Sequence, residues 1–127
     1  VVNRHGSRLP RHRGRLASFY AHADFQGRFD ITVHFVDEDI DSGPIIHHHK
    51  FPVDRTAPYA NILAEVFEAS ADVVDEAFTK LEAPGLEPKP NDGSKGTLNG
   101  FPSLAKARDY RQQLAEQRCG ASPPPPL

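Results

Sequence analysis

The sequence contains no methionine and no tryptophan, and its only cysteine is Cys119. A single cysteine excludes a disulfide within the chain, which favours a reducing, cytoplasmic setting. No apolar run approaches the roughly 20 residues that a membrane-spanning helix needs. The composition therefore predicts a cytoplasmic protein with no membrane partner.

The net charge is also small, because the sequence has 15 basic and 17 acidic side chains. Such a balance provides no overall attraction to nucleic acid or to a membrane surface. The length of 127 residues suits a single domain.

The opening Val1-Val2-Asn3 reads as the end of a buried strand followed at once by a polar loop. A lone strand end leaves its backbone groups without partners unless neighbouring strands supply them. Either later parts of this sequence supply these neighbours, or the sequence is a piece of something larger. Residues 119–127, with four consecutive prolines, predict a disordered tail.

The pattern of apolar, turn-forming and capping residues predicts an α/β fold with a β-hairpin and a long covering helix. In chain order we expect a loop at 4–14, a short helix at 16–23, a strand at 29–36, an acidic turn at 37–43, a second strand at 44–53, a helix at 56–81, a loop at 83–100 and a helix at 103–117. The two strands should pair antiparallel, because a long loop joins them directly.

The helix at 56–81 has the clearest periodicity. Thr56 is its expected N-cap and Ser103 that of the last helix. Apolar side chains recur at helical spacing at Ile62, Val66, Val73 and Ala77, with Phe67, Val74, Phe78 and Leu81 beside them. We expect the stripe of Phe67, Phe78 and Leu81 to pack in the core.

Three residues have side chains suited to acyl-transfer chemistry. Asn3 and His5 follow one another at a spacing that points both to the same side of an extended chain. An amide and an imidazole there offer two donors to one developing oxyanion. Asp41, at the mouth of the hairpin, would raise the pKa of His5 and help to take a proton. The alternative is that each of the three makes only local hydrogen bonds.

Two stretches of the sequence resemble the signatures of the folate-dependent formyltransferase family. The first is Asn3-Arg4-His5-Gly6-Ser7-Arg8-Leu9-Pro10 with Arg13-Gly14, in which Arg8 replaces a usual apolar residue. The second is Thr32-Val33-His34-Phe35-Val36 followed by Ile40-Asp41-Ser42-Gly43-Pro44-Ile45-Ile46. The second is most similar to glycinamide ribonucleotide formyltransferase, and Arg13-Gly14-Arg15 is similar to the tRNA and sugar formyltransferases.

The resemblance implies a partial Rossmann-like fold, in which residues 1–118 are the carboxyl-terminal half of a catalytic domain and an amino-terminal half is a missing partner. It also implies transfer of a formyl group from 10-formyltetrahydrofolate to a primary amine. Asn3, His5 and Asp41 then match the catalytic positions, and Ser7 and His34 support them. The turn Val36, Asp37, Glu38, Asp39, Ile40 and Asp41 matches the loop that lines the folate pocket.

The resemblance also implies a small, phosphorylated amine as acceptor, with glycinamide ribonucleotide, and hence purine biosynthesis, as the first choice. Methionyl-tRNA and an amino-sugar nucleotide remain alternatives. Water is another alternative acceptor, and it would make the protein a formyltetrahydrofolate hydrolase. The last alternative is that the chain is an inactive fragment of such an enzyme.

Two further groups of side chains invite binding hypotheses. His47 and His49 share one face of the second strand, so a metal with His34 or Asp41 as third ligand is one interpretation. We favour partly exposed polar residues there and predict no metal. The basic loop contains Arg4, Arg8, Arg11, Arg13 and Arg15. These arginines are either solvated or in contact with the phosphate groups of a substrate, such as a phosphorylated amine or tRNA.

Overall fold

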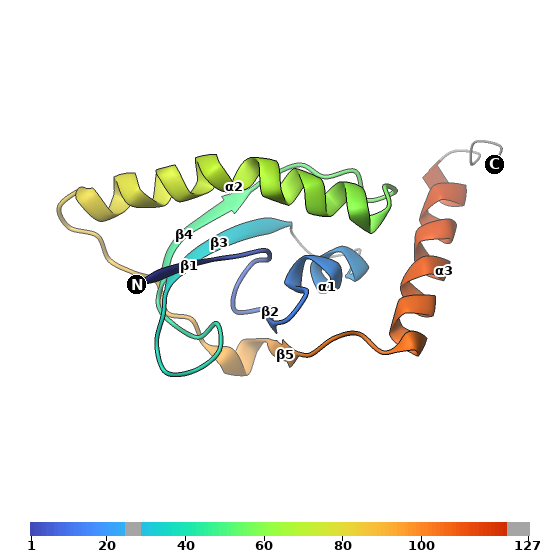
Figure 1. Cartoon of the computed structure of the whole chain (residues 1–127), viewed down its shortest axis with the longest axis horizontal. Helices are drawn as coiled ribbons and strands as arrows, with labels where there is room; N and C mark the ends of the chain where they lie inside the picture. The colour runs from blue at the N-terminus through green and yellow to red at the C-terminus, as the bar shows by residue number, and fades with distance from the viewer. Residues whose placement is uncertain (25–28, 122–127) are drawn as a thin grey trace.

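The computed structural model describes residues 1–24 and 29–121. At its centre is an antiparallel sheet in the order β1–β3–β4, formed by Val2–His5, Asp30–Phe35 and Ile45–Lys50. Helix α2, Tyr59–Glu82, runs along one face of this sheet. A second, parallel pair of strands, β2 (His12–Gly14) and β5 (Thr97–Asn99), lies on the side away from α2 (Figure 1).

The pairing of β3 with β4 confirms the predicted antiparallel hairpin. Ile31 and Val33 are 0% and 1% exposed and belong to the core under α2. Thr32 and His34 point to the opposite face and are buried as well. A bulge between Val33 and His34 shifts the register of β4. β4 ends at Lys50, earlier than the expected residue 53.

Helix α2 buries the predicted row of Ile62, Val66, Val73 and Ala77 against the sheet. The expectation for the neighbouring aromatic residues is wrong, because Phe67 is 64% and Phe78 is 47% exposed. These two positions are rotated around the helix away from the buried row, so they reach the edge of the contact rather than its centre.

The predicted start of α2 is also wrong. The helix begins at Tyr59 after Pro58, with no side-chain cap. Instead of capping the helix, the Thr56 hydroxyl donates to Asp54 Oδ1 at 2.6 Å. An Asp with Thr two residues later forms a local turn that competes with helix initiation.

The segments expected to be loops contain additional short elements. β1 includes Arg4 and His5, β2 lies within 4–14, and both β5 and the 3₁₀ turn Gly93–Lys95 lie within 83–100. Strands of three residues have no periodicity to detect, and β2 and β5 pair only through the folded chain.

Helix α3 (Leu104–Ala121) forms one end of the molecule, and helix α1 (Ala17–Ala23) lies between it and the central sheet (Figure 1). Ser103 Oγ accepts from the Lys106 N–H at 3.0 Å, so the predicted cap is present. Tyr110 and Leu114 of α3 pack on Phe19 and Ala23 of α1 as a second apolar cluster. The backbone of residues 119–121 is helical rather than disordered, and the remainder of the predicted tail, 122–127, lies outside the described residues.

Strand β1 is not buried as expected. Val1 is 99% exposed and Val2 only partly buried. Within the described residues β1 pairs with β3 alone, so one of its edges has no neighbouring strand. Among the described helices, none combines the length and the apolar character needed to cross a bilayer.

Candidate active site

The strand pairing brings Asn3 and His5 to one face of the sheet. Asn3 lies opposite His34, and His5 lies opposite Thr32. Because successive side chains of a strand alternate between faces, all four point away from α2. His5 and His34 are 6% and 2% exposed.

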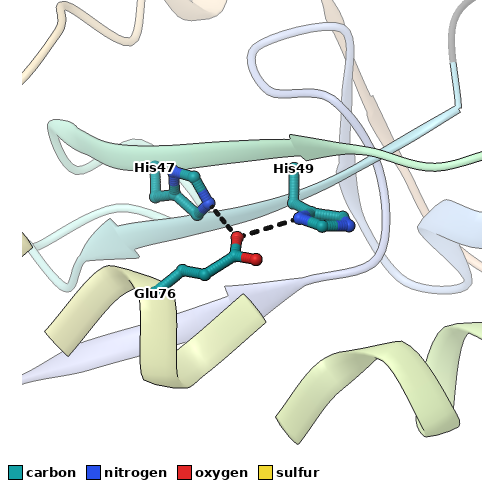
Figure 2. Close-up of side chains that lie close together, drawn as sticks. All are labelled: His47, His49 and Glu76. Atoms are coloured by element: carbon teal, nitrogen blue, oxygen red, sulfur yellow. Dashed lines mark hydrogen bonds and ion pairs between the residues drawn. The ribbon is translucent and has the colours of Figure 1, made fainter. Parts of the chain in front are cut away.

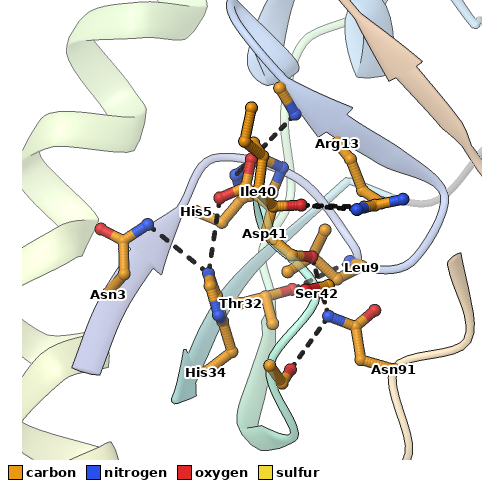
Figure 3. Close-up of polar contacts among 12 residues, drawn as sticks. Asn3, His5, Leu9, Arg13, Thr32, His34, Ile40, Asp41, Ser42 and Asn91 are labelled. Carbon is orange, nitrogen blue, oxygen red and sulfur yellow. Dashed lines mark hydrogen bonds and ion pairs between the residues drawn. The ribbon is translucent and has the colours of Figure 1, made fainter. Parts of the chain in front are cut away.

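Asp41 reaches this group from the turn between β3 and β4 (Figure 3). Its Oδ2 lies 3.5 Å from His5 Nδ1, and its Oδ1 lies 3.6 Å from His34 Nε2. Asn3 Nδ2 lies 3.5 Å from the same His34 nitrogen. An amide, two imidazoles and a carboxylate therefore converge, and His34 lies between Asn3 and Asp41 rather than behind them.

The loop after β1 is fixed by buried hydrogen bonds. His5 Nε2 and Ser7 Oγ both donate to the carbonyl of His12. Thr32 Oγ1 donates to the carbonyl of Ser7 at 2.7 Å and accepts from the Leu9 N–H at 3.1 Å. Buried polar groups with satisfied partners hold a loop rigidly, so His5 is kept at one position and in one tautomer.

Arg8 has a structural role in the same loop. Its Nη1 lies 2.7 Å from Oδ2 of Asp30, which is fully buried. A buried carboxylate needs a charged partner. The departure of Arg8 from the family signature is thus coupled to Asp30 at the start of β3.

The Asp41 turn is held from several directions. Asp41 itself has φ of 51°, a left-handed conformation that few non-glycine residues adopt. The Gly14 N–H donates to its Oδ2 at 2.8 Å, and Arg13 donates twice to the carbonyl of Ile40, at 3.0 and 2.7 Å. Asn91 Nδ2 donates to the carbonyls of Asp41 and Gly43 at 2.9 and 3.0 Å.

Sequence reasoning missed the role of Asn91, which lies 50 positions after Asp41. Its only local signal is a place in the polar stretch Pro-Asn-Asp-Gly, which is typical of any turn. Gly43, in contrast, is required by space, because an added Cβ would lie 1.7 Å from the carbonyl oxygen of Phe35.

Burial and charge set the protonation of this group. Burial lowers the pKa of His5 below its ordinary value, and the Asp41 carboxylate only partly offsets this effect. The expectation that Asp41 gives His5 a raised pKa is therefore wrong, since desolvation of the charged ring outweighs the attraction.

His34 and Asp41 behave as an ion pair. Burial lowers the pKa of His34, but its contacts with Asp41 and the Phe35 carbonyl outweigh burial and raise the pKa above its ordinary value. Burial raises the pKa of Asp41, but His34, His5 and the Gly14 N–H bring it below its ordinary value. Asp41 is thus an anion near neutral pH.

The expected folate-binding turn is accessible. Residues 36–40 are exposed, with Val36 at 51% and Ile40 at 60%. A hollow of about 610 Å³ adjoins it, lined by Gly14, Arg15, Ile40, Asp41, Leu98, Asn99 and Gly100. An apolar-edged hollow beside a carboxylate has the size and chemistry of a small-molecule site.

The arginines of the basic loop each have a local partner in the described structure. Arg11 pairs with Asp24, Arg13 with the Ile40 carbonyl, and Arg15 lies over the ring of Phe101 at 4.7 Å. Arg4 lies 5.7 Å from the ring centre of Phe67. These contacts do not support phosphate binding by the loop as a whole.

The metal alternative weighed from the sequence required His34 or Asp41 as third ligand to His47 and His49. The structure contradicts that set. His47 and His49 face α2, whereas His34 and Asp41 lie on the opposite face of the sheet.

Comparison with known proteins identifies the family of the chain. The sequence profile of the family described as formyl transferase matches residues 1–77. The chain belongs to the formyl transferase family. It is 31% identical over 109 residues to a methionyl-tRNA formyltransferase of Synechococcus sp. (strain JA-2-3B'a(2-13)), covering 86% of this chain and 33% of that protein. It is 33% identical over 92 residues to the methionyl-tRNA formyltransferase of Dechloromonas aromatica, covering 72% and 30%.

Solved formyltransferase structures share the fold. The formyltransferase PseJ from Anoxybacillus kamchatkensis, solved with a formamido sugar nucleotide and tetrahydrofolate, superposes with a TM-score of 0.68 at 16% identity, covering 87% of this chain and 56% of that one. The sugar 3N-formyltransferase WlaRD gives 0.68 at 17% identity, covering 90% and 46%. This likeness confirms the Rossmann-like α/β class. The chain spans about a third of the length of the curated relatives it matches.

Proposed function

We propose that Asn3, His5 and Asp41 are the catalytic residues of a formyl transfer from 10-formyltetrahydrofolate to a primary amine. The observation that carries this proposal is the convergence of the three side chains, with Asp41 Oδ2 3.5 Å from His5 Nδ1 although 36 positions separate them. Local hydrogen bonding alone does not require an amide, an imidazole and a carboxylate to meet on one face of the sheet.

The chemistry follows from charge. The amine attacks the formyl carbon, so a nitrogen–carbon bond forms and the formyl oxygen becomes negative. Asn3 supplies a neutral N–H donor to that oxygen, worth on the order of 10² to 10³ in rate. His5, whose pKa burial lowers, stabilises the oxygen in its protonated form, which it reaches by taking a proton from solvent. As the negative charge develops, it favours the charged form of His5 against the effect of burial.

Asp41 handles the proton. The attacking nitrogen becomes positive, and the carboxylate, ionised near neutral pH, attracts its proton directly or through a water molecule. When the intermediate collapses, the bond from the formyl carbon to the folate nitrogen breaks and that nitrogen takes the proton. His34 holds Asp41 in place through the 3.6 Å ion pair and acts as a positioning residue.

The folate donor fits the turn at residues 36–41, because residues 36–40 are exposed and Ile40 and Asp41 line the hollow. PseJ and WlaRD were solved with reduced folates, and that supports the same class of donor here. The assignment of Val36, Asp37, Glu38, Asp39 and Ile40 to the folate pocket remains part of the proposal.

For the acceptor we propose methionyl-tRNA rather than glycinamide ribonucleotide. The relatives at 31% and 33% identity are methionyl-tRNA formyltransferases, and neither supports the link to purine biosynthesis that the sequence suggested. An amino-sugar nucleotide is the runner-up, supported by the substrates of the proteins that share the fold.

The test is incubation of the chain with 10-formyltetrahydrofolate and each of three amines: methionyl-tRNA, an amino-sugar nucleotide and glycinamide ribonucleotide. Tetrahydrofolate formation that depends on methionyl-tRNA supports the proposal, and dependence on another amine changes the acceptor. Formate release without any amine would make the protein a hydrolase.

A binding measurement covers the case in which this part of the enzyme binds the donor but turns over no substrate. Titration with 5-formyltetrahydrofolate, followed by amide NMR shifts, should perturb Ile40 and Asp41. Absence of both turnover and perturbation at this turn would overturn the proposal.

A further inference from the structure

A second cluster of polar side chains lies on the face of the sheet that carries α2. His47 and His49 project from β4 toward the helix, because residues two apart in a strand share a face. Glu76 projects from α2 to meet them (Figure 2). The Oε2 atom of Glu76 lies 2.6 Å from His47 Nε2 and 2.9 Å from His49 Nδ1.

The three side chains offer one ligand atom each, and these atoms all lie within 4.8 Å of one another. Without a cation, both imidazoles have to donate a proton to the same carboxylate oxygen. With a cation between them, the same three atoms would coordinate it at ligand distances of about 2.0–2.2 Å, once the two contacts to Oε2 open to the separation of roughly 3.3 Å that tetrahedral ligands have. The side chains come from two rigid elements, which is how a metal site is held in register.

Access and charge favour a cation at this position. Glu76 is 44% exposed and His49 30% exposed, while His47 is 13% exposed at the inner end. A hollow of about 280 Å³ opens beside them, lined by His49, Ala69, Asp72, Asp75 and Glu76. It has room for metal-bound water, and Asp72 and Asp75 add negative charge around it.

We propose that His47, His49 and Glu76 bind a divalent transition-metal ion, with Zn²⁺ as the first choice. Two imidazoles and one carboxylate suit Zn²⁺ and its neighbours in the first transition row, whereas Mg²⁺ and Ca²⁺ prefer oxygen ligands alone. The remaining coordination positions open toward the hollow and take water. This site lies across the sheet from Asn3, His5 and Asp41 and does not depend on the proposed formyl transfer.

The test is a calorimetric titration of Zn²⁺ into the full chain with Cys119→Ser, because the exposed thiol of Cys119 would otherwise bind the ion independently. We expect one saturable site per chain. Glu76→Gln and, separately, His49→Gln should each weaken binding at least about tenfold, by loss of a direct ligand.

Glu68→Gln is the matched control. It removes the same charge from the same helix at an exposed position outside the cluster, and binding should stay within about twofold of the parent. Circular dichroism verifies that each variant is folded. Both ligand positions are partly exposed, so the folded state should survive these changes.

A spectroscopic measurement separates coordination from loose attraction. Four-coordinate Co²⁺ bound by two imidazoles, a carboxylate and water absorbs visible light more strongly and at longer wavelength than the hydrated ion, and Glu76→Gln should remove this stronger absorption. Absence of saturable Zn²⁺ binding, or equal affinity in the parent and in both ligand variants, would show that the cluster is only an ion pair and would overturn the proposal.

Discussion

Asp41 combines an unusual backbone conformation with a charge that two imidazoles and the Gly14 N–H stabilise. Sequence reasoning placed Asn3, His5 and Asp41 together because their residue types suit one reaction and because two linked motifs carry them. It could not assign partners such as Asn91 and Glu76, whose contacts exist only after distant elements pack together. It also predicted a raised pKa for His5, whereas burial lowers that pKa, because the burial of a side chain cannot be inferred from a loop sequence.

At this scale, Asp41→Asn should lower formyl transfer about 10²- to 10⁴-fold, through loss of the proton acceptor. The same change should destabilise the fold by about 1 kcal/mol near neutral pH. The pKa of Asp41 is below its ordinary value in the folded chain, so this stabilisation is present above the unfolded pKa and is lost as pH falls through the folded pKa. Denaturant unfolding at pH 7 and pH 3, with Asp39→Asn as the exposed control, checks the sign. A variant difference that does not shrink at pH 3 would contradict this account.

The two buried histidines of the candidate active site should have pKa values shifted in opposite directions from the ordinary value. His34 should titrate above it and His5 below it. His34 therefore contributes stability below pH 6.5 that is lost as pH rises through its folded pKa, whereas His5 contributes stability above pH 6.5 that is lost as pH falls toward its folded pKa. NMR titration of the imidazole protons measures both, and Asp41→Asn should lower the pKa of His34. A His34 pKa that stays unchanged in this variant would show that Asp41 is not its main partner.

Among the elements, α2 shows what amphipathic spacing predicts and what it does not. The row from Ile62 to Ala77 follows directly from the 3.6-residue period. The same period cannot set the width of the buried stripe, which depends on how far the sheet extends beneath the helix. Phe67 and Phe78 fall outside that width. The short strands β2 and β5 were missed for a related reason, because their pairing is a property of the folded chain.

Two substitutions in α2 compare how much a buried and an exposed position contribute to the free energy of unfolding. Ile62→Ala should lower the free energy of unfolding by about 2–5 kcal/mol, because it leaves a cavity at a fully buried position. Phe67→Ala removes a larger side chain but should cost less than about 1 kcal/mol, since Phe67 is 64% exposed and its main polar contact is with Arg4. Urea unfolding of both variants provides the measurement. Equal losses would mean that Phe67 is covered in solution.

At the scale of the whole molecule, the buried apolar residues within 1–24 and 29–121 form two clusters. The larger lies between the sheet and α2, and the smaller joins α1 to α3 through Phe19, Ala23, Tyr110 and Leu114. The α/β class, the hairpin and the covering helix were predictable because long periodic segments specify them. The division into two clusters was not, because the position of α3 depends on contacts such as the hydrogen bond between Tyr110 and His22 at 2.8 Å.

The division predicts local opening of α3. Leu114→Ala should raise hydrogen exchange of α3 amides at least about tenfold while β3 amides change little, because local opening need not disturb the larger cluster. Leu104→Ala, at a position 67% exposed on the same helix, is the control and should leave the exchange pattern unaltered. An equal increase in β3 and α3 would indicate a single cooperative unit.

Strand β4 presents imidazoles to both sides of the sheet, because His47 and His49 face Glu76 while His48 lies 3.0 Å from Thr32 Oγ1. The face to which each imidazole points depends on whether an odd or an even number of residues separates it from the bulge, because successive side chains alternate between faces. Inserting one residue between Ile46 and His47 would turn His47 and His49 toward Thr32 and leave a single imidazole for Glu76. A length change inside β4 therefore alters both surfaces at once, whereas the same insertion in the exposed turn at 37–40 leaves that parity intact.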